Sequence, residues 1–84
     1  MSISWKTKTF DELSTQELYQ ILRLRSEVFV VEQNCVYQDI DNKDHKALHL
    51  FGIVEGEIIA YSRLFKPGDY FKEASIGRVV VAEK

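Results

Sequence analysis

The sequence has few of the residues by which cofactor sites are usually recognised. Its 84 residues include one cysteine, Cys35, one proline and four glycines. No G-x-G-x-x-G or Walker-type loop occurs, so a phosphate cradle of either kind is excluded within these residues. A single cysteine cannot close a disulfide within the chain, which favours a reducing compartment, and we expect the cytoplasm.

Long apolar runs and blocks of like charge are also missing. The stretch MSISWKTKTFDEL alternates polar and apolar residues instead of forming a signal-peptide core, and no run reaches the roughly 18 apolar residues of a membrane span. Eleven basic and thirteen acidic residues give a net charge of −2 without a basic stripe. Because nucleic acid binding needs clustered Lys and Arg, we expect neither nucleic acid nor a membrane as a partner.

The composition that is present is that of one small globular domain. Hydrophobic residues make up 45% and charged residues 29% of the chain. A domain of this size buries a modest fraction of its surface, so its margin of stability is thin.

Residues 3–29 predict a strand followed by a helix. Residues 3–10 alternate with a period of two, as a half-buried strand does. Ser14 and Glu17 form a capping box, and Leu13 with Leu18 has the spacing of a hydrophobic staple. The helix then carries a stripe at three- and four-residue steps, which consists of Leu18, Ile21, Leu22, Arg25, Val28 and Phe29.

Residues 36–84 predict a loop and three strands. Residues 36–47 are rich in Asp and Asn without a period, and a loop of this length is a candidate for function. Residues 48–54 and 58–65 predict a central antiparallel hairpin, covered on both faces, around a turn that contains Gly56. Residues 66–74 predict a turn, and residues 75–84 a fourth strand.

The fourth strand contains the run Val79-Val80-Val81, which is typical of a fully buried strand. A buried strand needs a neighbour on each edge, whereas one helix and four strands leave roughly half of the sheet uncovered. We therefore expect the 84 residues to be the front part of a larger fold.

The aspartates of the loop suggest a metal site at first. An EF-hand that begins at Asp39 needs Gly at its sixth position and Glu at its twelfth, where this chain has Asp44 and Leu50. We therefore predict no metal. A thiol nucleophile at Cys35 with His45 or His49 as its base is a minor alternative, because nothing in the spacing brings these groups together.

Three arginines lie within apolar patterns, where an unpaired charge is costly. The stem of Arg25 either packs while its head reaches solvent, or its guanidinium orients a carboxylate of the following loop. Arg63 and Arg78 predict either structural ion pairs or substrate contacts, with Glu32 and Asp39 as candidate partners. Gly77 marks either a bulge or a close approach, or else a tight contact with the helix.

The segments FVVEQNCVYQDID (29–41), HLFGIVEGEIIAYSRL (49–64) and IGRVVVAEK (76–84) together resemble the N-terminal half of the ElaA-type branch of the GNAT N-acetyltransferase superfamily. The likeness covers nearly the whole chain in the order of the family. It implies an α/β (α+β) fold with a mixed, mostly antiparallel sheet of about four strands and one main helix. Residues 1–84 would be the N-terminal half of a single acetyltransferase domain.

The resemblance implies acetyl transfer from acetyl coenzyme A to a small-molecule amine or an exposed amino group. Val79, Val80 and Val81 would bind the pantetheine arm through their backbone groups, and an amide near Val79 would polarise the thioester carbonyl. Glu32 would shape the acceptor pocket and relay a proton. The segment 29–41 would wall the acceptor side, with Gln33 among its substrate-binding residues beside Arg63 and Arg78.

The chain departs from the family after residue 84, where an R/Q-x-x-G-x-G/A segment that binds the pyrophosphate is expected. We therefore expect the chain alone to be inactive, with the remainder absent from this sequence or supplied by a second chain. A homodimer is a further expected arrangement. The alternative function is a non-catalytic binding module built on the same half-fold.

Overall fold

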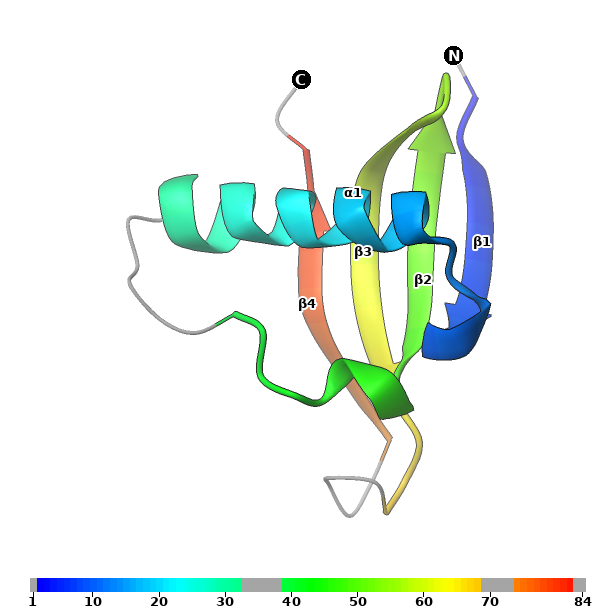
Figure 1. Ribbon diagram of the computed structural model, residues 1–84, viewed down its shortest axis with the longest axis vertical. Helices are drawn as coiled ribbons and strands as arrows, with labels where there is room; N and C mark the ends of the chain where they lie inside the picture. Colours follow the sequence, from blue (N-terminus) through cyan, green and yellow to red (C-terminus); the bar gives the residue numbers. More distant parts are fainter. Residues whose placement is uncertain (1, 33–38, 69–73, 83–84) are drawn as a thin grey trace.

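The computed structural model describes residues 2–32, 39–68 and 74–82, and for residues 30–32 only the backbone. Four strands form one antiparallel sheet in the order β1-β2-β3-β4, with bounds Ser4–Thr9, Leu48–Val54, Glu57–Phe65 and Ser75–Val81. The helix α1 (Thr15–Ser26) crosses one face of the sheet (Figure 1). The predicted four strands and main helix are thus confirmed, and the hairpin β2–β3 is central.

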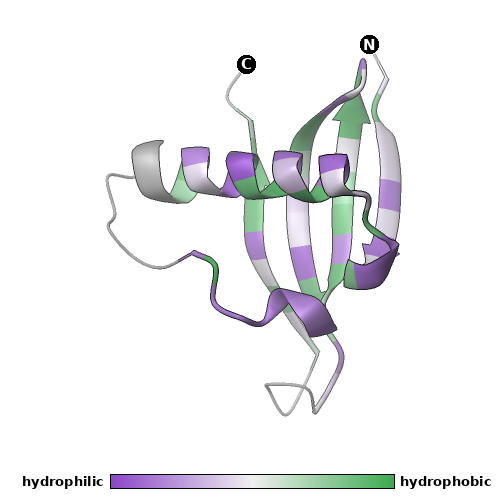
Figure 2. Cartoon of the chain, viewed as in Figure 1, coloured by the Kyte–Doolittle hydropathy of each residue, from purple (hydrophilic) through white to green (hydrophobic). Residues whose placement is uncertain are grey.

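The start of α1 is set by the predicted capping box. The Ser14 hydroxyl accepts a hydrogen bond from the Glu17 N–H at 3.0 Å, and the Glu17 carboxylate accepts one from the Ser14 N–H at 2.8 Å. The same carboxylate pairs with Lys8 at 2.9 Å, which fixes α1 to β1. Beyond Ser26 the chain continues as a π-helical turn, Glu27–Glu32. Two 3-10 turns are also described, Phe10–Glu12 between β1 and α1 and Asp44–Lys46 before β2, and the second is hydrophilic (Figure 2).

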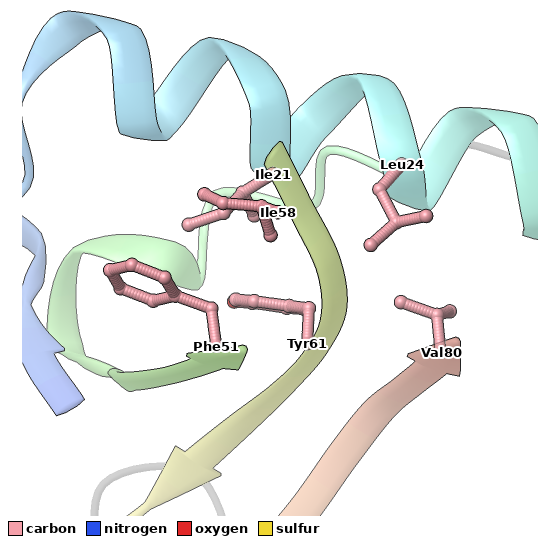
Figure 3. Packing of buried hydrophobic residues seen from close by; sticks show 6 residues of the cluster. All are labelled: Ile21, Leu24, Phe51, Ile58, Tyr61 and Val80. Atoms are coloured by element: carbon pink, nitrogen blue, oxygen red, sulfur yellow. The ribbon is translucent and has the colours of Figure 1, made fainter. Parts of the chain in front are cut away.

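The hydrophobic core lies between α1 and the sheet. The helix α1 and the strands β2, β3 and β4 together contribute six buried side chains, which meet there (Figure 3). They are Ile21, Leu24, Phe51, Ile58, Tyr61 and Val80. Leu24 rather than the predicted Leu22 is buried, because the face that meets the sheet is centred on Ile21 and Arg25 and leaves Leu22 at its border.

The hairpin β2–β3 turns through Glu55 and Gly56, which have positive φ of 51° and 80°. Two left-handed residues match the twist of the flanking strands, which is why a glycine is favoured here. The Gln20 side chain accepts a hydrogen bond from the Ile58 N–H at 3.0 Å, so α1 also contacts this end of the hairpin through a polar bond.

The face of the sheet away from α1 is partly open in the described residues. Trp5, Gly52, Ala60 and Val81 are neighbours in one row across the strands, so the side chains of Trp5, Ala60 and Val81 share this face. Trp5 is 57% exposed and Val81 65% exposed. On the hairpin itself Ala60 and Ser62 are 6% and 8% exposed, so its second face is largely buried although α1 does not cover it, and the open positions lie on the outer strands.

The valine run of β4 follows the same alternation. Val80 faces the core and is 3% exposed, whereas Val79, at 63%, lies on the open face. The prediction of a fully buried run is thus correct for Val80 and wrong for Val79 and Val81. In the described residues β4 pairs with β3 along one edge only.

Candidate functional site

A β-bulge interrupts β4 at its centre. Tyr61 pairs with Val80 and Arg63 with Gly77, so Arg78 and Val79 together lie opposite the single residue Ser62. Arg78 has a φ of 53°, a left-handed conformation that few residues with a side chain adopt. The bulge predicted at Gly77 therefore lies one residue further along the strand.

Gly77 itself has open space around it. A Cβ added there would meet no atom within 4 Å, so the alternative of a tight contact with the helix is wrong. Gly77 instead lies directly before the bulge, next to the left-handed residue Arg78.

The second edge of β4 presents backbone groups beyond the bulge. The N–H of Ala82 donates to the carbonyl of Ile59 at 2.6 Å, which places residues 82 and 80 in the pairs that bond to β3. Because bonded and non-bonded pairs alternate along an antiparallel ladder, the peptide groups of Val81 point away from β3. An extended ligand could pair with this edge as an added strand.

Three arginines and three aspartates lie beside the bulge and form a closed ring of ion pairs, here called the Arg/Asp ring. Each arginine contacts two aspartates and each aspartate contacts two arginines, so the charges alternate and sum to zero. The nitrogen–oxygen distances around the ring are Arg25–Asp39 3.0 Å, Asp39–Arg78 2.8 Å, Arg78–Asp41 3.3 Å, Asp41–Arg63 2.8 Å, Arg63–Asp44 3.0 Å and Asp44–Arg25 2.9 Å.

One side of the Arg/Asp ring is buried and the other meets solvent. The side chains of Arg25 and Arg63 are 0% and 5% exposed, whereas those of Arg78 and Asp41 are 20% and 21% exposed. Burial alone would raise the pKa of Asp41, but hydrogen bonds from Arg63 and the Lys43 N–H lower it to about 2. Asp41, the most exposed acid of the ring, is therefore ionised at neutral pH.

The segment that supplies the aspartates is shaped by its own side chains. The Asp41 carboxylate accepts a hydrogen bond from the Lys43 N–H at 3.1 Å, and Asn42 is left-handed with a φ of 68°. Asp44 then begins the 3-10 turn, which the Ala47 N–H closes on the Asp44 carbonyl at 3.2 Å. These turns direct the D-x-D-x-x-D carboxylates to one side, toward the arginines.

The carboxylates that resembled a calcium loop are thus paired with guanidinium groups. Among the described residues, no group of three or more His, Cys, Asp and Glu side chains is arranged to hold a metal ion.

The structure decides between the two interpretations of Arg25. Its guanidinium is fully buried and orients Asp39 and Asp44, so the prediction that it reaches solvent is wrong and the second one is confirmed. Arg63 and Arg78 both form ion pairs, as one of the two interpretations predicted. Asp39, a candidate partner for either arginine, pairs with Arg78, whereas Arg63 pairs with Asp41 and Asp44, and the side chain of the other candidate, Glu32, lies outside the described part.

The roles of Asp41 and Asp44 were missed from the sequence. A signal was available, since three arginines isolated in apolar patterns match in number the three aspartates of one loop.

A second polar chain connects the core to the Arg/Asp ring through His49. Its Nε2 lies 3.0 Å from the Asp44 carbonyl, which can only accept, so Nε2 carries the hydrogen. Nδ1 then accepts from the Tyr61 hydroxyl at 2.6 Å. Burial lowers the pKa of His49 and raises that of Tyr61, so both stay neutral at pH 7. His49 is the satisfied strand residue that was expected, and neither ring nitrogen is free to act as a base.

The remaining predicted site residues are only partly placed. Glu32 ends the π-helical turn, and its side chain lies outside the described part, as do Gln33 and Cys35 altogether. Their predicted roles stay predictions. Val79, Val80 and Val81 lie on the bulged strand, next to the Arg78 corner of the ring.

A groove of about 190 Å³ runs over the open face beside the bulge. Its lining is almost entirely apolar and includes Trp5, Leu50, Val79 and Val81. Ser62, opposite the bulge, also lines it, and its hydroxyl is buried without a hydrogen-bond partner in the described residues.

Comparisons with known proteins point to one group. No protein-family model matches the chain. It is 46% identical over 83 residues to protein ElaA of Escherichia coli K12 and 40% identical over 84 residues to a UPF0039 protein of Synechocystis, covering 54% of each relative. A UPF0039 protein of Schizosaccharomyces pombe is 44% identical over 75 residues. The chain therefore spans about half the length of the curated relatives it matches.

Two solved structures share the fold. An acyl-CoA N-acyltransferase from Pseudomonas aeruginosa superposes with a TM-score of 0.91 at 42% identity, over 96% of this chain and 57% of that one. The crystal structure of Escherichia coli ElaA gives 0.91 at 45% identity, over 98% and 57%.

In the described part of the chain no helix has the length and apolar character needed to cross a membrane. The sheet, the helix and the relatives agree with the resemblance drawn from the sequence. The chain is a homologue of the ElaA and UPF0039 proteins and has the fold of the N-terminal half of a GNAT acyltransferase.

Proposed function

We propose that the chain is the N-terminal part of an N-acetyltransferase that moves the acetyl group of acetyl coenzyme A to an amine. The acceptor is a small-molecule amine or an exposed amino group. The observation that carries this proposal is the bulged strand β4, whose second edge presents the Val81 peptide groups outward in the described residues. The Pseudomonas aeruginosa relative, named as an acyl-CoA N-acyltransferase, supports an acyl coenzyme A as the donor.

The residues of β4 fit the pantetheine arm. An arm that carries amide groups can pair with the outward peptide groups of the strand as an added strand does. A bulge breaks the alternation of the ladder, so a peptide N–H near Val79 is released from the regular pattern and can face the thioester carbonyl as an oxyanion-hole donor. The bound cofactor would supply the activated acetyl thioester.

The acceptor side would be formed by the end of the helix and the segment that follows it. In the proposal Glu32 shapes the acceptor pocket and relays the proton that the ammonium group loses, while Gln33 contacts the acceptor. Arg63 and Arg78 are proposed to line the same side. Both guanidinium groups are already paired with aspartates, so they would add no free positive charge to that side. Arg78, whose side chain is 20% exposed, would form its surface, and Arg63, at 5%, would support it through Asp41.

The proposal includes a limit on the chain itself. The glycine-containing pyrophosphate segment expected in such enzymes is not among these 84 residues, so we propose that they bind the arm weakly and do not turn over substrate alone. Completion by a second chain, or a homodimer, would be the partner arrangement. A cytoplasmic location is proposed from the single cysteine.

The test is a titration of the ¹⁵N-labelled 84-residue chain with S-acetylpantetheine, which carries the arm and the thioester without the nucleotide. Amide shifts at Val79, Val80 and Val81 should move in fast exchange and saturate in the millimolar range. Pantetheine with a free thiol is the matched control, and it should move Val81 while leaving Val79 nearly unchanged.

A lack of saturable shifts on β4, or shifts confined to the outer surface of α1, would contradict the proposal. That outcome would favour the alternative of a non-catalytic binding module on the same half-fold.

A further inference from the structure

We propose that the Arg/Asp ring positions the bulge of β4, with Arg78 as the positioning residue. Arg78 is the one residue that belongs both to the ring and to the bulge. Its left-handed backbone is unfavourable for a residue with a Cβ and persists only where the surroundings determine it. The catalytic meaning of this inference rests on the proposed function, but the structural part does not.

The contacts of Arg78 explain how the ring acts on the backbone. Its Nε lies 2.8 Å from the Asp39 carboxylate, and its Nη2 donates to the Asp39 carbonyl at 3.1 Å and lies 3.3 Å from Asp41. Because a guanidinium is planar and makes several directed bonds, these contacts fix its orientation as well as its place. The contacts of the guanidinium therefore fix the backbone of Arg78, and with it the peptide that joins Arg78 to Val79.

The aspartates that bind Arg78 are themselves anchored in the body of the protein. Asp39 is bound by Arg25 of α1 at 3.0 Å, and Asp41 by Arg63 of β3 at 2.8 Å. The left-handed bulge is thus connected to the helix and to the central hairpin through ion pairs and charged hydrogen bonds. The segment 39–44 and the bulge form one rigid unit, so the acceptor side and the cofactor strand are coupled.

The test uses the full 84-residue chain and three variants that alter the contacts between Arg78 and the aspartates in different ways. Asp41→Asn removes one charge at the solvent side of the ring, and Arg78→Lys keeps the charge but loses the planar fork. Arg78→Gly permits the left-handed backbone but removes every side-chain contact with Asp39 and Asp41. Asp11→Asn, an exposed carboxylate outside the ring, is the control.

The readout is amide hydrogen exchange, residue by residue. In Asp41→Asn and Arg78→Lys the amide of Val80, which bonds to β3, should exchange about tenfold faster, while that of Phe51 in the central hairpin keeps its rate. Arg78→Gly should show the same fast exchange, because a backbone that adopts the left-handed conformation easily does not replace the ion pairs of the Arg78 side chain. Asp11→Asn should match the parent chain.

The inference is overturned if the Val80 amide keeps its parent rate, if all strands accelerate equally, or if Arg78→Gly restores protection. Titrating the same samples with S-acetylpantetheine separates this inference from the proposed function. If the parent chain shows no β4 shifts, the proposed function fails while the exchange rates still test the ring. If the parent binds and the variants bind equally well, the positioning role fails.

Discussion

The apolar cluster and the Arg/Asp ring lie side by side beneath α1, and they contribute differently. Ile21 and Leu24 enter the cluster, and the next residue, Arg25, enters the ring. The cluster gains free energy from area removed from water, which has no direction and tolerates changes of shape. The ring consists of ion pairs and directed hydrogen bonds between charges that are buried on one side, where desolvation offsets much of their attraction. The difference teaches that the cluster supplies most of the net stability while the intact ring supplies geometry at β4, and that breaking the ring is costly because it leaves buried charges unpaired.

The largest effect should come from breaking the ring at its buried side. Arg25→Met leaves Asp39 and Asp44 short of one partner each in a buried setting, and we expect a loss of about 3–5 kcal/mol in the free energy of unfolding. A loss of that size approaches the whole stability of a small domain. Urea unfolding followed by circular dichroism measures it.

Arg23→Met is the control for that variant, since its pair with Glu27 is solvent-exposed at 3.9 Å, and it should cost under about 0.5 kcal/mol. Equal effects for the two variants would mean that the ring contributes no more than a surface ion pair.

Breaking the cluster should cost somewhat less and act differently. Ile21→Ala removes a fully buried side chain and should lower stability by about 2–4 kcal/mol through lost burial and a residual cavity. Since the cluster acts through undirected burial shared by the helix and three strands, amide exchange should accelerate alike in all strands. Acceleration confined to the Val80 amide would contradict the division of roles between cluster and ring.

Acid should weaken the ring before it weakens the cluster. The pKa of Asp41 is about 2 in the fold against 3.8 when unperturbed, so its contribution is complete above about pH 4 and is lost as the pH falls to 2. We expect a loss of about 1–2 kcal/mol over that window after allowance for solvent screening. Asp41→Asn should flatten this part of the stability curve, and an unchanged slope would show that Asp41 is not the titrating group.

The smallest effect concerns His49, which links the ring to the core. Burial lowers its pKa, so the unfolded chain takes up a proton first as the pH falls below 6.5. Stability should therefore decline gently from pH 7 to pH 5, and His49→Gln should remove that decline while lowering stability at pH 7. Thermal melts at half-unit steps of pH measure it, and an increase in stability toward pH 5 would contradict the neutral, buried assignment.

Interactions between residues close in sequence made the fold predictable, but they did not predict the pairs of the Arg/Asp ring. The capping box of Ser14 and Glu17 and the turn at Gly56 involve residues close in sequence, so spacing alone indicates them. The family resemblance added the half-fold. The ring joins α1, a loop and two strands, and no spacing encodes which of three aspartates meets which arginine. Leu22 was assigned to the core for a related reason, since one extra apolar residue blurs the edge of a helical stripe.

The most direct test of the connection between ring, bulge and cofactor edge is an intermolecular nuclear Overhauser measurement on the 84-residue chain with ¹³C-acetyl-labelled S-acetylpantetheine. The acetyl methyl group should show cross-peaks to the Val79 amide in the parent chain, and these should weaken in Asp41→Asn. Cross-peaks to the outer face of α1 instead, or equal Val79 cross-peaks in both chains, would contradict it.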